Sequence, residues 1–260
     1  MNSVVISTAG RPDELSQARA SAVQQALGYE VIPRNKRSVA ALMATYESDV
    51  LIAGKERYEL YRRSMCEPFF FHPDTAAFRL KRLMKGETDP LVEAGQLTPG
   101  NSFLDCTLGL ATDSIVASFA VGVSGEVKGI EADRDVAFIT AAGLAQFEPK
   151  FQELQDSMRR ISVIQDSAMT VLSRLPDQSW DVVYLDPMFS QTISESTSFA
   201  PLKQAGVQGS LTEEWVSEAI RVAGKRVVVK AHFSDAVFER FGFTRINRPN
   251  TKFHFGYIEK

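Results

Sequence analysis

Short apolar runs alternate with segments of helical periodicity along most of the chain, a pattern that predicts an α/β protein. In the first part of the chain the pattern predicts three strands separated by two helices. The expected strands are 4–6, 29–32 and 50–52, and the expected helices are 13–27 and 38–45. This unit is too small for a full nucleotide-binding fold, so we assign residues 1–62 to a small N-terminal α/β subdomain.

Residues 63–97 form a connector in which the pattern predicts one helix, beginning at Asp74 or Thr75 and ending at Lys85. We expect its apolar residues to face the protein and its basic residues to face solvent. The apolar set is Phe78, Leu80, Leu83 and Met84, and the basic set is Arg79, Lys81, Arg82 and Lys85. Arg79 and Arg82 are therefore candidates for contacting the phosphates of a substrate, although a merely solvated helix face has the same pattern.

Residues 98–260 repeat the strand–helix alternation and form the main domain. The expected strands are 102–106, 126–130, 161–164, 180–185, 226–230, 243–248 and 252–258, and the expected helices are 113–121, 135–147, 168–175 and 212–223. The last two strands are joined by a short Pro-Asn turn and form an antiparallel hairpin. A Rossmann-like parallel sheet that ends in such a hairpin is the architecture of class I methyltransferases and not of ordinary dehydrogenases.

Composition excludes several classes of protein. With 44% hydrophobic and 23% charged residues, the 260-residue chain is typical of globular domains. It has no apolar run near the roughly 20 residues of a membrane span and no pattern of a secretory signal. Two cysteines without a CxxC pair and three histidines argue against a disulfide framework or a metal site. We expect a cytoplasmic protein.

Charge is unevenly distributed along the chain. Residues 101–224 carry 8 Lys and Arg against 17 Asp and Glu, a net −9. Residues 225–260 carry 8 against 3, a net +5. The basic C-terminal end is compatible with a nucleic acid bound along it, or with an ordinary solvated surface.

The stretch FLDCTLGLATDS follows the first strand of the main domain. Asp105 ends the strand, Gly109 lies in the turn, and Asp113 opens the next helix. A dinucleotide site would have a G-x-G-x-x-G turn there, and carboxylates disfavour a phosphate. They suit a ligand with a cationic amine and hydroxyl groups, such as S-adenosyl-L-methionine (SAM). The alternative is a capped helix without a ligand.

The next two strands of the main domain also end in acids. Glu131 is placed to accept hydrogen bonds from both ribose hydroxyls, and Asp166 from the adenine amino group. Three consecutive strands that end in acids predict a nucleoside site at the carboxyl edge of the sheet.

The fourth strand ends in the stretch WDVVYLDPMFS. Methylation of an exocyclic amine requires acceptors that hold its N–H bonds, because the nitrogen lone pair is delocalised into the ring. Asp186 supplies a carboxylate, and Pro187, which has no N–H, turns the backbone so that carbonyl groups point the same way. Phe189 is expected to stack on the base. The alternative is a capping acid beside a core aromatic.

Ordered motifs over roughly residues 68–260 resemble the RsmJ-type methyltransferases, which modify guanine N2 in small-subunit ribosomal RNA. The motifs are FFFHPDTAAFRLKRLMKG, FLDCTLGLATDS, IEAD, VVYLDPMF, RVVVK and KFHFGYIEK. By this resemblance the SAM site is lined by Thr112, Asp113, Glu131, Ala132, Asp166, Ser167 and Asp186. We add Asp105, Thr107 and Gly109 from the first loop. The chain departs from the family at Ala111 and Thr112, where the family has glycine and arginine, and at Ser190, where it has proline.

The predicted activity is SAM-dependent methylation of an exocyclic amine, with ribosomal RNA or the small ribosomal subunit as partner and no metal. Lys230 and His232, at the end of the fifth strand, are candidates for substrate contact. Two alternatives remain: the same chemistry on another RNA or on adenine N6, and a SAM-binding RNA assembly factor without turnover.

Overall fold

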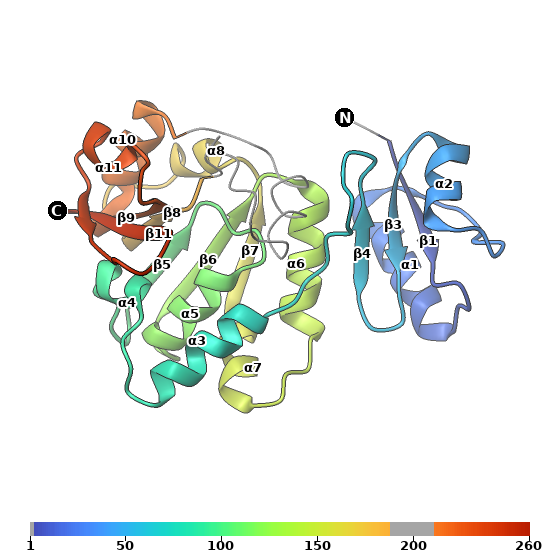
Figure 1. Ribbon diagram of the computed structural model, residues 1–260, viewed down its shortest axis with the longest axis horizontal. Coiled ribbons are helices and arrows are strands. Elements are labelled where there is room, and N and C mark those ends of the chain that lie inside the picture. The colour runs from blue at the N-terminus through green and yellow to red at the C-terminus, as the bar shows by residue number, and fades with distance from the viewer. Residues whose placement is uncertain (1–2, 188–210) are drawn as a thin grey trace.

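The computed structural model describes residues 3–187 and 211–260, which fold around two β-sheets (Figure 1). The smaller sheet has the strand order β2-β1-β3-β4, with β4 antiparallel to β3. Its strands are β1 Val4–Thr8, β2 Glu30–Val31, β3 Asp49–Ala53 and β4 Tyr58–Tyr61. Helices α1 (Glu14–Leu27) and α2 (Val39–Tyr46) contribute to separate apolar clusters on its two faces.

The larger sheet has the order β10-β11-β9-β8-β5-β6-β7. Its strands are β5 Ser102–Asp105, β6 Glu126–Glu131, β7 Ile161–Gln165, β8 Trp180–Leu185, β9 Ala223–His232, β10 Thr244–Ile246 and β11 Phe253–Glu259. Strands β5 to β9 are parallel, whereas β11 is antiparallel to both β9 and β10. This is the Rossmann-like class I methyltransferase fold that the sequence pattern predicts.

Helices cover both faces of the larger sheet (Figure 1). Those on one face are α3 Asp74–Met84, α4 Pro90–Gly95, α5 Thr112–Val121, α6 Arg134–Gln146 and α7 Gln152–Arg159. Those on the other face are α8 Ala168–Leu172, α10 Glu213–Val222 and α11 Val237–Arg240. No helix of the described residues is long and apolar enough to cross a membrane.

The apolar core of the first face is continuous with the core under α1. Val23 and Leu27 of α1 belong to the same buried cluster as Tyr58 of β4 and Ile139 of α6. The small sheet therefore lies against α6 at one end of the molecule (Figure 1). The division into residues 1–62, 63–97 and 98–260 stays a prediction.

Several helix ends follow directly from the sequence. Asp13 caps α1 in a reciprocal capping box with Ser16, and Gly28 ends the helix at φ 71°, a conformation that glycine adopts without steric cost. Asp133 accepts hydrogen bonds from the first-turn N–H groups of α6, and Thr212 caps α10. The expected strands and helices are present, with ends displaced by a few residues, whereas β4, α4, α7 and α11 were not expected.

One expectation about the connector helix is wrong. On α3, Phe78 and Met84 are exposed, whereas Arg79 is largely buried. The reason is electrostatic, because two buried carboxylates lie beneath the helix and the Arg79 guanidinium pairs with both of them. A reading of helix faces from hydrophobicity alone places every arginine outside.

Candidate active site

Asp105, at the end of β5, holds the following loop in place. Its carboxylate accepts hydrogen bonds from the Thr107 N–H (2.9 Å) and from the Ser114 hydroxyl (2.6 Å), and the residue is only 1% exposed. Burial raises the pKa of Asp105 to about 7, against an ordinary value of 3.8, and the nearby charges of Asp113 and Asp186 add to the rise. Asp105 thus fixes the conformation of the loop that follows β5.

Glu131, at the end of β6, ties this loop to the second strand. One carboxylate oxygen accepts from the Gly109 N–H (3.0 Å) and the other from the Asp133 N–H (2.9 Å). The Gly109 carbonyl in turn accepts from the Thr140 hydroxyl at 2.7 Å. Each carboxylate oxygen has a second lone pair, so Glu131 retains capacity for a pair of hydroxyl donors.

Close packing fixes the height of the loop above the sheet. A Cβ atom at Gly129 of β6 would lie 2.2 Å from the Leu108 side chain, so the loop seats only over a glycine. Ala111 is the residue before α5 and adopts φ 58°, a left-handed conformation that is rare outside glycine. The small alanine side chain is fully buried there. This is one of the positions at which the chain departs from the RsmJ pattern.

Asp113, in the first turn of α5, is the centre of a buried network of charges. Its carboxylate binds the Arg79 guanidinium (2.5 Å), the Lys230 ammonium (3.0 Å) and the Tyr184 hydroxyl (2.9 Å). Burial alone would raise the pKa of Asp113, but the charges of Lys230 and Arg79 hold it well below its ordinary value. The Asp113 carboxylate therefore stays ionised between two cations.

Asp186 follows β8 and lies beside this network. Its backbone N–H donates to the Thr107 hydroxyl at 2.8 Å, and its carboxylate binds the Lys230 ammonium at 2.7 Å. The Asp186 side chain is 31% exposed, whereas Pro187 is buried. Thr107 and Lys230 thus bring the first loop, β8 and β9 together at one edge of the sheet. Phe189 lies outside the described residues.

The remaining predicted cofactor residues line the neighbouring part of the same edge. The Asp166 N–H donates to the Glu131 carbonyl at 3.2 Å, and the Asp166 side chain is partly exposed, with Arg174 at 3.5 Å. Ser167 caps α8, and the Ala132 carbonyl accepts from Gln165. Thr112 is the first residue of α5. The structure therefore brings all the predicted cofactor residues to the carboxyl edge of β5 to β8.

The predicted substrate residues lie in different environments. Lys230 is part of the charge network, and His232 ends β9 with its Nδ1 atom 2.7 Å from the Ser234 hydroxyl. Arg82 is exposed and pairs with Glu87 at 2.7 Å. Arg79 pairs with Asp89 and Asp113, so it acts inside the protein as a brace for α3 and α5.

Sequence reasoning missed two members of the site. Tyr184 was taken as a core strand residue, and Ser114 was passed over inside the loop motif. Their partners lie far along the chain or across a turn, so only the alternation in β8, which puts Tyr184 on the face of α5, could have indicated its role.

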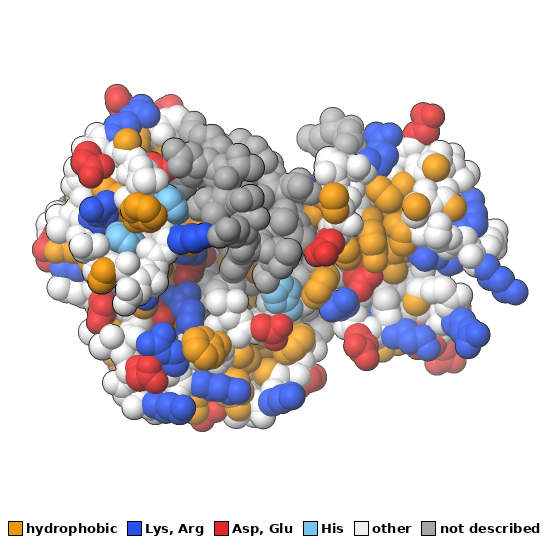
Figure 2. Space-filling view, viewed as in Figure 1, with side chains coloured by type: hydrophobic (Ala, Val, Ile, Leu, Met, Phe, Trp, Pro, Cys, Tyr) orange, Lys and Arg blue, Asp and Glu red, His pale blue; other side chains and the backbone are white. Residues whose placement is uncertain are grey.

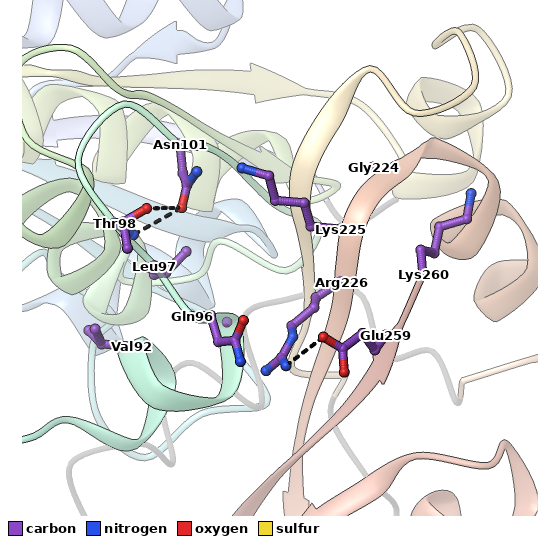
Figure 3. A pocket seen from close by; sticks show the side chains of 11 residues that line it. Val92, Gln96, Leu97, Thr98, Asn101, Gly224, Lys225, Arg226, Glu259 and Lys260 are labelled. Carbon is purple, nitrogen blue, oxygen red and sulfur yellow. Dashed lines mark hydrogen bonds and ion pairs between the residues drawn. The ribbon is translucent and has the colours of Figure 1, made fainter.

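A separate pocket lies at the opposite edge of the sheet (Figure 3). This cavity of about 590 Å³ is lined by residues near the start of β9 and the end of β11, including Lys225, Arg226 and Glu259. Arg226 pairs with Glu259 at 3.0 Å and donates to the Ala94 carbonyl, and Lys225 pairs with Asp181. Lys225 and Arg226 are thus engaged with protein groups.

The hydrogen-bond acceptors at the carboxyl edge fit SAM. Glu131 and Asp166 offer carboxylate oxygens to hydroxyl and amino donors, and the loop after β5, residues 106–111, contains no cationic side chain that would favour a phosphate. Among residues 3–187 and 211–260, no group of three or more His, Cys, Asp or Glu side chains is arranged to hold a metal ion.

Comparisons with known proteins agree with this fit. The profile of a family described as "Putative SAM-dependent methyltransferase" matches residues 34–240. The chain is 43% identical over 255 residues to the uncharacterized protein YpiP of Bacillus subtilis (strain 168), covering 98% of this chain and 99% of that protein.

A solved structure shows the same fold. The SAM-dependent methyltransferase NGO1261 from Neisseria gonorrhoeae has a TM-score of 0.59 at 18% identity, covering 98% of this chain and 95% of that chain. TrmN from Thermus thermophilus has a TM-score of 0.45 at 16% identity, covering 99% and 71%, and is too distant to inform the substrate. The chain therefore belongs to this family of SAM-dependent methyltransferases, and its cofactor is SAM.

Proposed function

We propose that this protein methylates an exocyclic amine, and that its target is guanine N2 in small-subunit ribosomal RNA. The observation that carries the proposal is the Asp186-Pro187 turn. It lies at the carboxyl end of β8, joined through Thr107 to the loop that follows β5. An acceptor in this position is what methylation of an amine requires and what cofactor binding alone does not.

The bound SAM supplies an electrophilic methyl group. The chain's part is to hold the amine and to keep its nitrogen nucleophilic. Asp186 accepts a hydrogen bond from the amine N–H, which favours the pyramidal form with its lone pair on nitrogen. Pro187 has no backbone N–H and a fixed φ, and it turns the chain so that backbone carbonyls point the same way as the Asp186 carboxylate. Orientation of the amine toward the methyl group supplies much of the rate.

Lys230 stabilises the two carboxylates of this half-buried site. Its ammonium lies 2.7 Å from one oxygen of Asp186 and 3.0 Å from Asp113, so it offsets two negative charges. Burial alone would lower the pKa of Lys230, but the two carboxylates raise it above its ordinary value. The ammonium therefore stays charged and fixes the Asp186 carboxylate for the substrate. We assign Lys230 to positioning Asp186.

The substrate assignment rests on the motifs shared with RsmJ-type enzymes, DPMF and RVVVK in particular. The basic charge of residues 225–260 supports a nucleic-acid substrate. Phe189 is proposed to stack on the target base, and Arg82 to contact phosphates. A ribosomal substrate implies a cytoplasmic protein that acts on free ribosomal RNA or on the small subunit.

The experiment is methyl transfer from labelled SAM to small ribosomal subunits and to naked ribosomal RNA, both from a strain that lacks this gene. Digestion and mass spectrometry then identify the product. N2-methylguanosine is the expected nucleoside. Label on another base would retain the amine chemistry and reject the target, whereas absence of label with SAM bound would favour the assembly factor or a protein substrate.

A further inference from the structure

Three aromatic rings adjoin at the end of the β9–β11 pair, and we call them the hairpin aromatic patch: His232, Phe233 and Phe253. The His232 ring lies 4.5 Å from that of Phe233 and 6.1 Å from that of Phe253, between ring centroids. Phe233 is 49% exposed and Phe253 38% exposed. Single exposed apolar residues are ordinary, but a contiguous set of exposed rings is typical of a binding surface.

Two members of the patch, His232 and Phe253, lie on the same side of the sheet as the charge network, and Phe233 follows at the end of β9. His232 is paired directly with Phe253, and Lys230 precedes His232 by two residues, so all three side chains project from one face. One two-residue step along a strand is about 7 Å. His232 is therefore about one nucleotide's length along β9 from Lys230, which touches Asp186.

Basic residues lie beside Phe233 and along the adjoining turn between β10 and β11. Arg245 is exposed on β10 and donates from its guanidinium to the Phe233 carbonyl at 2.8 Å, and Arg248 and Lys252 flank the turn between β10 and β11. Figure 2 shows hydrophobic and histidine side chains beside Lys and Arg side chains over this part of the molecule. Rings that can stack on bases, set among cations that can meet phosphates, match single-stranded nucleic acid.

We propose that the hairpin aromatic patch binds the single-stranded RNA next to the methylated nucleotide, with bases stacked on Phe233 and Phe253. Arg245, held beside Phe233, contacts the adjoining phosphate. A base-paired helix keeps its base faces covered, so the surface selects an unpaired segment. The proposal rests on the proposed function only in taking RNA as the substrate, and the patch is separate from the residues assigned to methyl transfer.

The test is binding of a fluorescein-labelled single-stranded RNA of about 12 nucleotides, and of a duplex of the same sequence, in the presence of SAM. Wild type is expected to prefer the single strand. Phe233→Ala/Phe253→Ala should weaken its binding roughly tenfold or more, because each stacked base is lost. Phe233→Tyr/Phe253→Tyr should retain it. Phe147→Ala, an exposed ring at the far end of α6, is the matched control and should change nothing.

SAM affinity and methyl transfer to ribosomal RNA are measured on the same variants. An unchanged RNA affinity of the alanine double variant overturns the patch, and so does an unchanged KM for RNA in an active enzyme. If that variant instead loses only transfer to assembled subunits, the patch binds protein and the proposal is wrong. If RNA binding depends on the two rings while no RNA is methylated, the patch stands and the proposed function fails.

Discussion

Single residues in this site differ most in how their charge is balanced. Asp105 and Asp113 are both buried and lie close together. Burial raises the pKa of Asp105, which has hydroxyl and N–H donors but pairs with no cation among residues 3–187 and 211–260. For Asp113 the effect of burial is outweighed by Lys230 and Arg79, so its pKa is lowered. The partners, and not the depth, decide the charge of each acid.

This difference predicts how Asp105→Asn changes stability with pH. In wild type the Asp105 pKa is about 7 when folded and near its ordinary 3.8 when unfolded. The unfolded chain releases this proton first, so the contribution of Asp105 to stability is full at low pH and is lost as the pH rises through about 7. Asparagine removes that loss and can keep both hydrogen bonds. Urea unfolding between about pH 4 and pH 8 should show that the free energy of unfolding of the variant increases relative to that of wild type as pH rises. If the difference between the two proteins did not change with pH, the raised pKa of Asp105 would be refuted.

Among the elements, α3 shows what a sequence pattern can and cannot give. Its bounds follow from the flanking Pro73 and Gly86, but the burial of Arg79 depends on Asp89 and Asp113, which lie 10 and 34 residues further along the chain. Burial alone would lower the pKa of Arg79, and the two carboxylates raise it instead. Arg79 therefore fastens α3 to α5 beside the proposed active site.

Arg79→Met should destabilise the fold by about 3 kcal/mol, because two buried carboxylates lose a shared cation. Arg82→Met, three residues along the same helix, removes only an exposed pair with Glu87 and should cost less than about 0.5 kcal/mol. Free energies of unfolding from urea titrations compare the two. Equal effects would show that the Arg79 pairs contribute nothing beyond a surface ion pair.

The elements that were predicted correctly are those with the clearest apolar patterns. Strand β8 was expected at its observed bounds because Val182 to Leu185 are apolar and buried on both faces. Helix α7 was missed because it follows a turn and offers only Leu154 and Met158 as spaced apolar positions. The acids at the strand ends were predictable from sequence, whereas the Lys230 and Thr107 bridges between strands depend on tertiary structure.

At the scale of the whole molecule, Arg62 joins the two sheets. It follows β4 and pairs with Asp49 of the small sheet at 3.6 Å. It also pairs with Asp133, the N-cap of α6, at 2.5 Å and with Asp135, in the first turn of α6, at 3.4 Å. Tyr29 adds a hydrogen bond to Asp135 at 2.8 Å. Asp133 also caps α6 and donates its N–H to Glu131, so this junction supports the cofactor edge.

Arg62→Ala should therefore lower stability by about 3 kcal/mol, since three carboxylates lose the cation that they share, although Asp49 keeps Arg63 at 4.0 Å, and should weaken SAM binding several-fold. Arg62→Lys keeps the charge without the planar guanidinium and should have an intermediate effect. Urea unfolding and calorimetric SAM titration measure the two consequences. If stability fell while SAM affinity stayed unchanged, Arg62 would join the two sheets without supporting the cofactor edge.

The central claim is that the Asp186 turn acts on the substrate amine, and one comparison of variants tests it most directly. Asp186→Ala is assayed for methyl transfer to ribosomal RNA and, by calorimetry, for SAM binding, with the exposed Asp156→Ala as control. We predict a loss of transfer of at least about a hundredfold, with SAM affinity largely retained and the control unaffected. Retained turnover in Asp186→Ala would contradict the account.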